Sequence, residues 1–540
     1  MARPDPLDAD SVLNRSRFGH TPALWLALPL LAGCALDAAA NLPAGWPLLI
    51  GGLASTCLWL CAGHPRGCAV CLLIAGIALG AAWHQLRTPP QDAFRPRRNY
   101  DELSVRIERA SPRRDDQGWT GLGVVTDRDG GLFRRRIALS ARGPTPAEGA
   151  ELKIAGRLSG LPTRPTGYDA WIASQGATLK LLGARVLGVL EPPGRFSVWC
   201  QTQQARLEAW LRSLPWTDPD GGALLAATML GRTSLLPEEA KAAFATTGTL
   251  HLFAISGLHI AGMAAAMLWI ARRLRLPELP AGLAVLAVLW LYVQVTGASP
   301  SSVRAWIMAA FLWGGQVGER ATPPLQSLAL ACAATLILTP DACRDPGFQL
   351  SYLAVLALIT AGGPAAEICA RPTLRETLTP DDAQTRTLRL WWKARRFALG
   401  GLCLSAAATI AGTPLTVGYF GSASWGGVFV NLVLVPLSEV PLVLGMLSAA
   451  LSPWDLLLPI ARWVNGLAAL GLHAMTCLAE WSAQIPGINL QLQTEQPWLG
   501  PLGAIVIATI LLAQAEQKSA WRLLGVPLTF LLLWMLVACL

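Results

Sequence analysis

The chain has 540 residues, of which 53% are hydrophobic and only 14% are charged, and its mean hydropathy is +0.43. A soluble protein of this length needs far more charge to cover its surface, so the composition excludes that class and indicates a polytopic membrane protein. The apolar runs are long and continuous, which indicates helices rather than a membrane barrel. The net charge of +9 is weak evidence for a polyanionic partner, because cytoplasmic loops are themselves rich in Lys and Arg.

The N-terminal region, residues 1–97, contains three apolar segments near 21–38, 43–62 and 67–86, which we expect to form membrane helices. A cysteine-rich stretch, CLWLCAGHPRGCAVC, joins the second segment to the third. Its polar or sulfur-bearing residues are Cys57, Cys61, His64, Cys68 and Cys71. They form either a metal clamp or a set of small side chains on two packed helices, and the second interpretation is favoured because such spacings are common by chance.

Residues 98–197 differ from their surroundings in being rich in charge, proline and short alternating stretches. Five stretches read as β-strands: 104–110, 121–127, 132–141, 151–158 and 177–190. The turn Asp129-Gly130-Gly131 between the second and third is typical of a hairpin. Five short strands in about a hundred residues predict a small β-barrel, for which an OB-like fold is one solution.

Basic and aromatic side chains gather in this predicted β-domain. They are Arg113, Arg114, Arg134, Arg135 and Arg136 together with Trp119, Phe133, Tyr168 and Trp171. A basic groove with aromatic stacking surfaces is what a binder of single-stranded nucleic acid needs. A solvated basic sheet edge that prevents aggregation explains the arginines equally well.

Residues 198–248 are expected to form amphipathic or interfacial helices. The stretch 197–214 offers one face to an interface, made of Trp199, Leu207, Trp210, Leu211 and Leu214. A second helix is predicted over 235–244, because Pro237 and two acidic residues occupy its first turn.

The remaining residues, 249–540, form a second multi-span membrane region. Apolar segments lie near 249–271, 281–297, 301–318, 325–340, 348–362, 398–415, 425–450, 457–484, 498–514 and 520–539. The segment 425–450 contains Asn431, Pro436, Glu439 and Pro441, so we expect a broken or re-entrant helix there. With the N-terminus inside, the basic loops all fall on the inside, and the β-domain falls outside.

The first of these segments begins with HLFAISGLHIAG, which is unusually polar for a span. His251 and His259 are eight residues apart, about 12 Å along a straight helix, too far to chelate one ion. Ser256 and His259 lack an orienting acid, which disfavours a hydrolase. Two interpretations remain: close helix packing that uses Ser256 and Gly257, or the polar lining of a passage.

Other intramembrane polar groups favour a passage. They are Ser301, Ser302, Arg304, Gln349, Asn431 and Glu439. Arg304 either snorkels to the membrane interface or lines a pore for an anion. Discontinuous helices that carry polar groups are typical of transport proteins, so a secondary transporter or exporter of a small or lipid-linked anion is an alternative to a channel.

Taken together, these motifs resemble the ComEC family of DNA-uptake channel proteins. The resemblance is carried by GRTSLLPEEAKAAFATTGTLHLFAISGLHIAG (231–262), TGASPSSVRAWIMAA (296–310), DPGFQLSYLAVLAL (345–358) and AGTPLTVGYFGSASWGGVFVNLVLVPL (411–437). The three early spans and the β-domain are similar to the family's N-terminal region. At 163–176 the family's asparagine-proline-glycine and phenylalanine-aspartate pattern is reduced to Gly167, Tyr168-Asp169 and Gly176.

The resemblance implies import of single-stranded transforming DNA through a multi-pass protein of the bacterial inner (plasma) membrane, with an OB-like domain receiving the strand outside. It implies no enzymatic activity and no cofactor in this chain. Many members carry a C-terminal metallo-β-lactamase-like domain, which the six histidines of this chain do not support. We therefore expect a separate nuclease, together with a DNA receptor and a cytoplasmic translocase, as partners.

Overall fold

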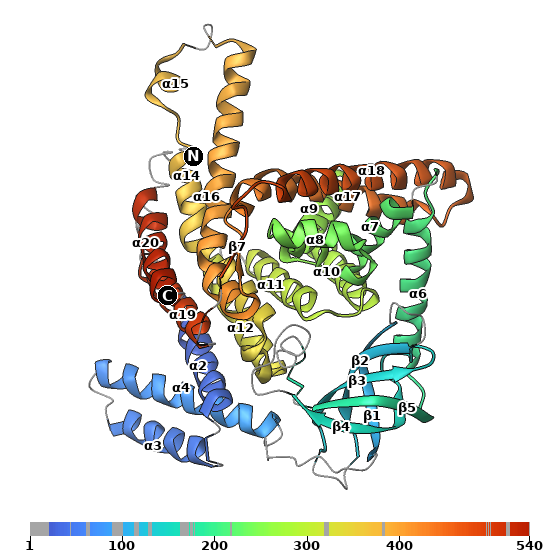
Figure 1. Cartoon of the computed structure of the whole chain (residues 1–540). Helices are drawn as coiled ribbons and strands as arrows, with labels where there is room; N and C mark the ends of the chain where they lie inside the picture. The colour runs from blue at the N-terminus through green and yellow to red at the C-terminus, as the bar shows by residue number, and fades with distance from the viewer. Residues whose placement is uncertain are drawn as a thin grey trace.

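The computed structural model shows a chain built of membrane-type helices and one β-barrel (Figure 1). The described residues are 21–40, 42–43, 45–60, 65–88, 101–112, 118–127, 132–161, 172, 176–177, 179–216, 219–317, 323–380, 384–492, 494, 496, 498–514 and 519–538. Within these residues, seven helices combine the length and apolarity needed to cross a membrane. The predicted fold class, a polytopic helical membrane protein with a small OB-like barrel, is confirmed.

The N-terminal region forms three helices, α2 (Leu24–Ala40), α3 (Trp46–Leu60) and α4 (Pro65–Arg87). Small residues allow α2 and α4 to approach closely, because a Cβ at Gly33 would overlap the carbonyl oxygen of Ile77. A Cβ at Gly80 would likewise overlap the carbonyl oxygen of Leu30. Backbone contact of this kind is how helices associate in a lipid environment.

Five strands form the closed barrel: β1 (Asp101–Pro112), β2 (Gly118–Val125), β3 (Arg136–Arg142), β4 (Glu151–Gly160) and β5 (Leu179–Glu191). Their order around the barrel is β1-β2-β3-β5-β4, and β1 also pairs with β4. The β3–β5 pair is parallel and the other pairs are antiparallel. Alternation along β4 buries Leu152, Ile154 and Leu158 inside the barrel. Residues 128–131, which include the predicted Asp129-Gly130-Gly131 turn, lie outside the described residues.

Helix α6 (Arg195–Arg212) leads from the barrel to the helical core, followed by α7 (Pro219–Leu230), η2 (Thr233–Leu235) and α8 (Glu238–Thr246). Leu207, Trp210 and Leu211 pack into this core, so the prediction that they face an interface is wrong. A hydrogen bond also holds Trp210 in this core, because its indole donates to Ser448 Oγ at 3.0 Å. Trp199 remains exposed and stacks on Phe196.

The second membrane region contains the remaining elements. They are η3 (Leu250–Phe253), α9 (Gly257–Arg273), α10 (Glu278–Val295), α11 (Pro300–Val317), α12 (Pro324–Leu338), η4 (Pro340–Arg344), α13 (Pro346–Ala357), the π-helical turn η5 (Leu358–Gly362), α14 (Gly363–Cys369), α15 (Leu374–Leu378), α16 (Arg386–Phe420), β6 (Ser422–Ala423), α17 (Gly427–Leu451), η6 (Asp455–Leu457), α18 (Leu458–Ala483), β7 (Leu490–Gln491), α19 (Leu499–Ala513) and α20 (Ala520–Ala538). Each expected apolar segment thus contains helix, although the first begins only at Gly257.

The expected break in segment 425–450 is absent, because α17 continues through Pro436 and Pro441. A proline removes one backbone donor, but in apolar surroundings the remaining backbone bonds are retained and neighbours fill the distorted turn. Ser438 Oγ donates to the carbonyl of Val435 at 2.7 Å, and the Pro441 ring packs against Gly471 of α18. The prediction of a broken helix is therefore wrong for this segment.

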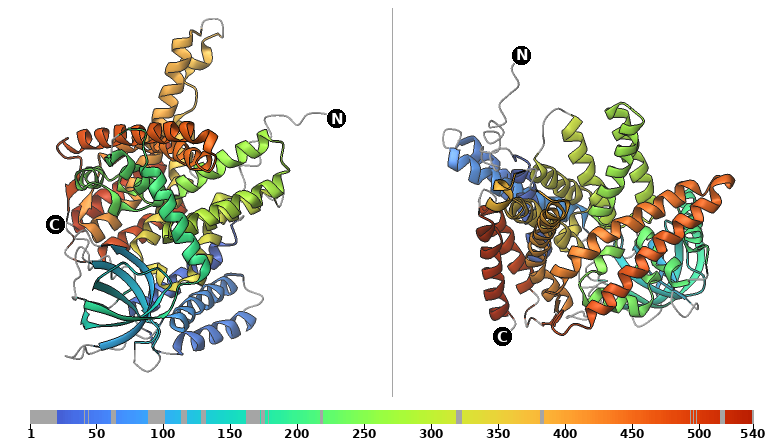
Figure 2. Two further views of the ribbon diagram at one scale, coloured as in Figure 1. Left: turned by 90° about the vertical axis from the view of Figure 1, so that its right-hand side faces the viewer. Right: turned by 90° about the horizontal axis from the view of Figure 1, so that it is seen from above.

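The barrel and the α15–α16 hairpin lie at opposite ends of the molecule (Figures 1 and 2). Helices α17 and α18 pack side by side and run across the direction of α16 in both figures. The apolar helices therefore do not all lie parallel to one membrane normal. The topology deduced by counting spans stays a prediction.

Candidate functional site

The barrel meets the helical region at a cavity of about 240 Å³. On the barrel side it is lined by Glu108, Arg109, Leu122 and Arg136. On the helical side the lining comes from the start of α11, the end of α12, and η4 with the residues that follow it. We call this the junction cavity.

Helix α11 enters the junction cavity through a strained turn. Gly297 and Ala298 have φ values of 89° and 45°, and the second is costly for a residue with a Cβ. Ser299 then caps the helix, because its Oγ accepts the backbone N–H of Ser302 at 3.3 Å. The predicted pathway residues Ser301 and Ser302 belong to this hydroxyl cluster, with Ser299 Oγ donating to Ser302 Oγ at 2.9 Å. The turn places Arg304 one helical turn further, beside the cavity.

Arg304 does not snorkel to the surface, since it is only 3% exposed. One guanidinium nitrogen donates to the carbonyl of Gly347 at 2.9 Å, and another lies 3.6 Å from Asp345 Oδ2. A charge this deeply buried persists only when paired. The structure therefore places Arg304 at an internal ion pair that lines the junction cavity, which excludes snorkelling, and the lining of a pore for an anion stays a prediction.

The segment that holds Arg304 is itself rigid. Asp345 caps α13 by accepting the Gly347 N–H at 3.0 Å, and Pro346 occupies the first helical position, where its missing donor costs nothing. Gln349 donates to the Cys343 carbonyl at 2.8 Å and accepts from the Tyr419 hydroxyl at 3.1 Å. Gln349 therefore links the end of η4 and the start of α13 to α16 by hydrogen bonds.

The barrel side contributes a second ion pair. A register shift in β1 between Ile107 and Arg109 turns Glu108 and Arg109 together toward the cavity. Arg136 binds Glu108 through two bonds of 2.6 and 3.0 Å. Burial acts to lower the pKa of Arg136, but the bonded Glu108 carboxylate raises it overall. Burial lowers the pKa of Arg109, which Glu148 and Glu108 oppose.

The junction cavity is electrically balanced. Three arginines, Arg109, Arg136 and Arg304, face three carboxylates. Those carboxylates belong to Glu108, Asp341 and Asp345. Complementary charge of this kind fixes the orientation of two surfaces. The cavity is thus first a docking contact between the barrel and the helices, and it is not a uniformly positive funnel.

A buried histidine extends this contact to the N-terminal helices. His84 of α4 lies between two carboxylates, with Nδ1 2.7 Å from Asp37 Oδ2 and Nε2 3.2 Å from Asp341 Oδ1. Gln85 donates to the other oxygen of Asp37 at 2.8 Å. Burial acts to raise the pKa of Asp341, but the hydrogen bond from His84 lowers it overall. The short turn η4, in the second membrane region, therefore contacts both the N-terminal helices, through His84, and the cavity that borders the barrel.

The HLFAISGLHIAG motif lies elsewhere, at the start of α9. His251 is exposed on η3, with its Nδ1 3.1 Å from the Gly248 carbonyl oxygen. His259 is 1% exposed and forms a capping box with Ser256: its N–H donates to Ser256 Oγ at 3.4 Å, and its Nδ1 accepts the Ser256 N–H at 3.5 Å. Both side chains bond to backbone groups, so this pairing is structural. The straight-helix spacing argument does not apply, because Gly257 begins the helix.

A second polar contact joins α9 to α17. A Cβ added at Gly262 would overlap Glu439 Oε2, so a larger residue there would require the Glu439 carboxylate to move. Asn431 lies near the start of α17, and a Cβ at Gly427 one turn before it would contact the Thr247 carbonyl oxygen at 2.8 Å. His259, Asn431 and Glu439 each have one buried polar atom without a partner in the described part of the chain. Of the predicted pathway residues, Glu439 thus lies at the α9–α17 contact and Arg304 lines the junction cavity.

The predicted nucleic-acid residues of the barrel have mixed outcomes. Trp119 is 0% exposed within the barrel core, so the prediction that it stacks on bases is wrong. Trp119 shares a buried cluster with Val125, Leu139 and Ile154, so its indole lies on the inner face of the barrel. Arg134 is exposed and Arg135 half-buried on the β2–β3 connection. Four other predicted residues, Arg113, Arg114, Tyr168 and Trp171, lie outside the described residues.

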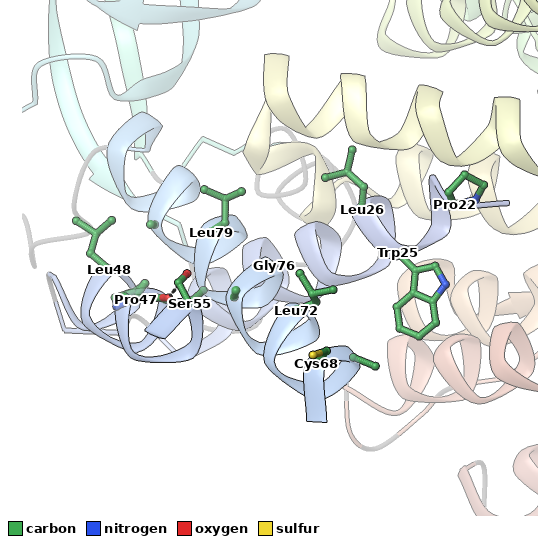
Figure 3. Close-up of a pocket in the computed structure, with 16 residues that line it drawn as sticks. Pro22, Trp25, Leu26, Pro47, Leu48, Ser55, Cys68, Leu72, Gly76 and Leu79 are labelled. Atoms are coloured by element: carbon green, nitrogen blue, oxygen red, sulfur yellow. Dashed lines mark hydrogen bonds between the residues drawn. The ribbon is translucent and has the colours of Figure 1, made fainter. Parts of the chain in front are cut away.

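A larger cavity than the junction cavity, about 890 Å³, lies among α2, α3 and α4 and has apolar walls (Figure 3). Leu26, Leu48, Leu72 and Leu79 are among its lining residues, and Ser55 and Cys68 are the hydroxyl and thiol that it contains. Its chemistry suits acyl chains and offers nothing to a phosphate. No group of three or more potential metal ligands occurs within the described ranges, and Cys61 and His64 of the cysteine-rich stretch fall outside them.

Several residues of the junction were missed by sequence reasoning. Glu108 and Arg109 resemble ordinary surface charges on a strand. Asp341 and Asp345 flank a short turn between two apolar segments, and this spacing of carboxylates beside prolines is the signal that could have drawn attention to them. His84 lies at the end of an apolar segment, with no local motif in the sequence that indicates its carboxylate partners.

Comparison with known proteins gives a consistent result. The sequence model of the Competence protein family matches residues 228–517, more than half of the chain. ComE operon protein 3 of Bacillus subtilis is 31% identical over 141 residues, which cover 26% of this chain and 18% of that protein. Competence protein ComA of Neisseria gonorrhoeae is 35% identical over 151 residues, which cover 26% of this chain and 22% of that protein.

An uncharacterized Escherichia coli protein, YcaI, is 31% identical over 166 residues, which cover 29% of this chain and 21% of that protein. The chain spans about a fifth of the length of these curated relatives. No solved structure matches. The matched region contains α9, α11, η4 and α17, which carry both polar contacts described above, and the chain belongs to the Competence protein family.

Proposed function

We propose that this protein is a membrane channel component that imports single-stranded DNA into the cytoplasm during natural transformation. The barrel receives the strand outside the inner membrane, and the helices of the competence region conduct it. The family membership and the names of two relatives support a role in competence. Conduction of a polyanion requires a protein-lined path, which polar groups between apolar helices can supply.

One observation carries the proposal: the OB-like barrel is docked directly on the family-matched helices. Arg136 from the barrel and Arg304 from α11 line the same cavity, although they lie far apart in the sequence. Barrels of this fold bind single strands with a basic and aromatic surface. Exposed Arg134 and Phe133 on the β2–β3 connection supply a basic and an aromatic side chain of this kind, which supports the proposal.

The size of the junction cavity limits how the strand moves. At about 240 Å³ the cavity is smaller than most small-molecule sites, which begin near 300 Å³. A nucleotide therefore passes only when the barrel moves relative to η4, because each of the two ion pairs lies within one side of the junction. We propose that the junction is closed in this structure and that strand binding opens it.

The proposal requires other proteins. A DNA receptor would deliver the strand, a cytoplasmic translocase would pull it, and a separate nuclease would remove the complementary strand. In this proposal the chain itself performs no covalent chemistry. The Ser256–His259 pairing supports that assignment, because both side chains are occupied as a helix cap.

Transformation of a deletion strain tests the proposal. Labelled DNA should reach the cytoplasm in the parent and in a strain complemented with the wild-type gene, and should stay outside in the deletion strain. Equal cytoplasmic uptake by the deletion strain and its parent would refute the role. An Arg304→Met complement at equal membrane abundance should restore less uptake than an Arg462→Met complement, which alters an exposed arginine of α18.

One observation favours a second candidate. At about 240 Å³ the junction cavity has room for a small anion or anionic headgroup beside its three arginines, but less room than a polymer needs. A transporter or exporter of such an anion would leave cytoplasmic DNA uptake intact on deletion. The same uptake measurement therefore separates the two candidates.

A further inference from the structure

The α15–α16 hairpin is the most prominent projection of the molecule, and it stands at the end opposite the barrel (Figures 1 and 2). Helix α16 has 35 residues, about 52 Å of helix, whereas a bilayer core is about 30 Å thick. The apolar part from Phe397 to Phe420 is long enough to cross that core. Residues 386–396, about 16 Å of helix, therefore project beyond it.

The projecting segment is strongly basic. Residues 371–397 include seven basic and three acidic residues. One acidic residue, Glu376, is already used: it accepts from Arg396 at 2.8 Å and from Arg395 at 3.4 Å, which clamps α15 against α16. Arg386, Arg389 and Lys393 are exposed, and no ion pair to them occurs among residues 371–380 and 384–397.

Exposed apolar side chains accompany these cations. Trp391 is 63% exposed, and its position along the helix is midway between those of Arg389 and Lys393. Trp392, its neighbour, is buried, so the exposure of Trp391 does not result from general looseness of the hairpin. Leu390 and Phe397 are 68% and 62% exposed and follow Arg386 and Lys393 on one stripe of the helix.

The distance of these residues from the hydrocarbon core distinguishes DNA from lipid headgroups as their anionic partner. Headgroups add only about 5–8 Å to each side of the hydrocarbon core. Phe397 lies at that level, where an aromatic ring suits the lipid interface. Lys393, Trp391 and Arg389 lie four, six and eight residues further out, about 6, 9 and 12 Å along the helix beyond Phe397, and thus outside the headgroup layer.

We propose that the outer part of this hairpin, with Arg389, Trp391 and Lys393, binds single-stranded DNA as it leaves the channel. This inference rests on the proposed function, which brings a strand to this end of the molecule. The arginine and lysine neutralise backbone phosphates, and the exposed indole stacks on a base whatever its identity. The hairpin is thus a second, sequence-independent contact that would disfavour backward movement of the strand.

Photo-crosslinking of the full chain in phosphatidylcholine nanodiscs tests the inference, since DNA reaches both faces of a nanodisc. A p-benzoyl-phenylalanine in place of Leu390 reports on the hairpin, and one in place of Phe133 reports on the barrel. With a fluorescent oligothymidylate, both probes should crosslink DNA. Arg389→Glu with Lys393→Glu should abolish crosslinking at the hairpin probe alone. Arg272→Glu with Arg275→Glu, an equal charge change at the end of α9, should leave it unchanged.

Equilibrium binding adds a quantitative criterion. The loss of two phosphate contacts should lower the slope of log K against log salt by roughly 1.4. Trp391→Ala should weaken binding about fivefold or more with the slope unchanged. Crosslinking at the barrel probe without crosslinking at Leu390 overturns the hairpin inference and leaves the proposed function standing. Absence of DNA at both probes overturns both. Crosslinks from Leu390 to lipid instead of DNA, with anionic nanodiscs, overturn the inference in favour of membrane binding.

Discussion

Replacing Arg304 by methionine tests whether the junction depends on a buried ion pair. Methionine keeps much of the length and volume of the side chain but removes the charge that faces Asp345 and the donor to the Gly347 carbonyl. At 3.6 Å and an effective dielectric of about 20, the gross Coulomb attraction is roughly 4–5 kcal/mol. The desolvation of a nearly buried guanidinium offsets much of it.

We expect Arg304→Met to lower the free energy of unfolding by about 2–4 kcal/mol, because Asp345 is left without its cation in a site that is still mostly buried. Asp345→Asn should cost less, since asparagine also caps α13. The double variant should be more stable than the sum of the two single effects predicts, with a coupling energy of about 1–3 kcal/mol.

The assay is equilibrium unfolding of the purified protein in mixed micelles, titrated with dodecyl sulfate, for the wild type and the three variants. An exposed pair on α8, Lys241 and Glu238 at 3.8 Å, provides the control cycle and should couple by less than about 0.5 kcal/mol. Additive effects at Arg304 and Asp345, equal to those of the control cycle, would refute the reasoning that this pair stabilises the helical wall of the junction cavity.

Three further predictions concern other parts of the fold. Gly262→Ala should destabilise the α9–α17 contact slightly, because its Cβ displaces the Glu439 carboxylate, and a second change, Glu439→Ala, should remove that effect on thermal stability; failure of that rescue contradicts the contact. Ala298→Gly should stabilise the protein by about 0.5–1 kcal/mol by relieving the positive φ, measured by the same unfolding titration, and a loss of stability would argue against strain there. Burial raises the pKa of Glu148 above its ordinary 4.5, so protonation of this group stabilises the fold at low pH and that contribution is lost as pH rises through the raised value. Glu148→Gln, which keeps an acceptor for the Ala110 N–H, should therefore raise the melting temperature at pH 8 and lose this advantage near pH 4, whereas a constant difference across that range would contradict it.

Much of the local structure was predictable because it follows from patterns that act over a few residues. Apolar runs of spanning length predicted the helices, and alternation predicted five strands whose inner faces hold Leu152 and Ile154. The Pro-rich run 425–450 misled this reasoning, because the local preference of Pro436 and Pro441 yields to the packing of α18 against α17. Trp119 misled it for a similar reason: one step of strand register decides between a stacking surface and the barrel core.

The sequence by itself determined that this is a membrane protein and that a small barrel lies between its helical regions. It also contained the motifs that mark its family. Hydrophobicity and periodicity are properties of neighbouring residues, so they need no knowledge of distant contacts. Only the tertiary structure decided which charges meet. Arg136 and Arg304 face one cavity, and His84 reaches Asp341, because the closed barrel and the α2–α4 helices converge on the turn η4. A buried charge must find its partner wherever the fold supplies one, and no spacing along the chain reveals that partner.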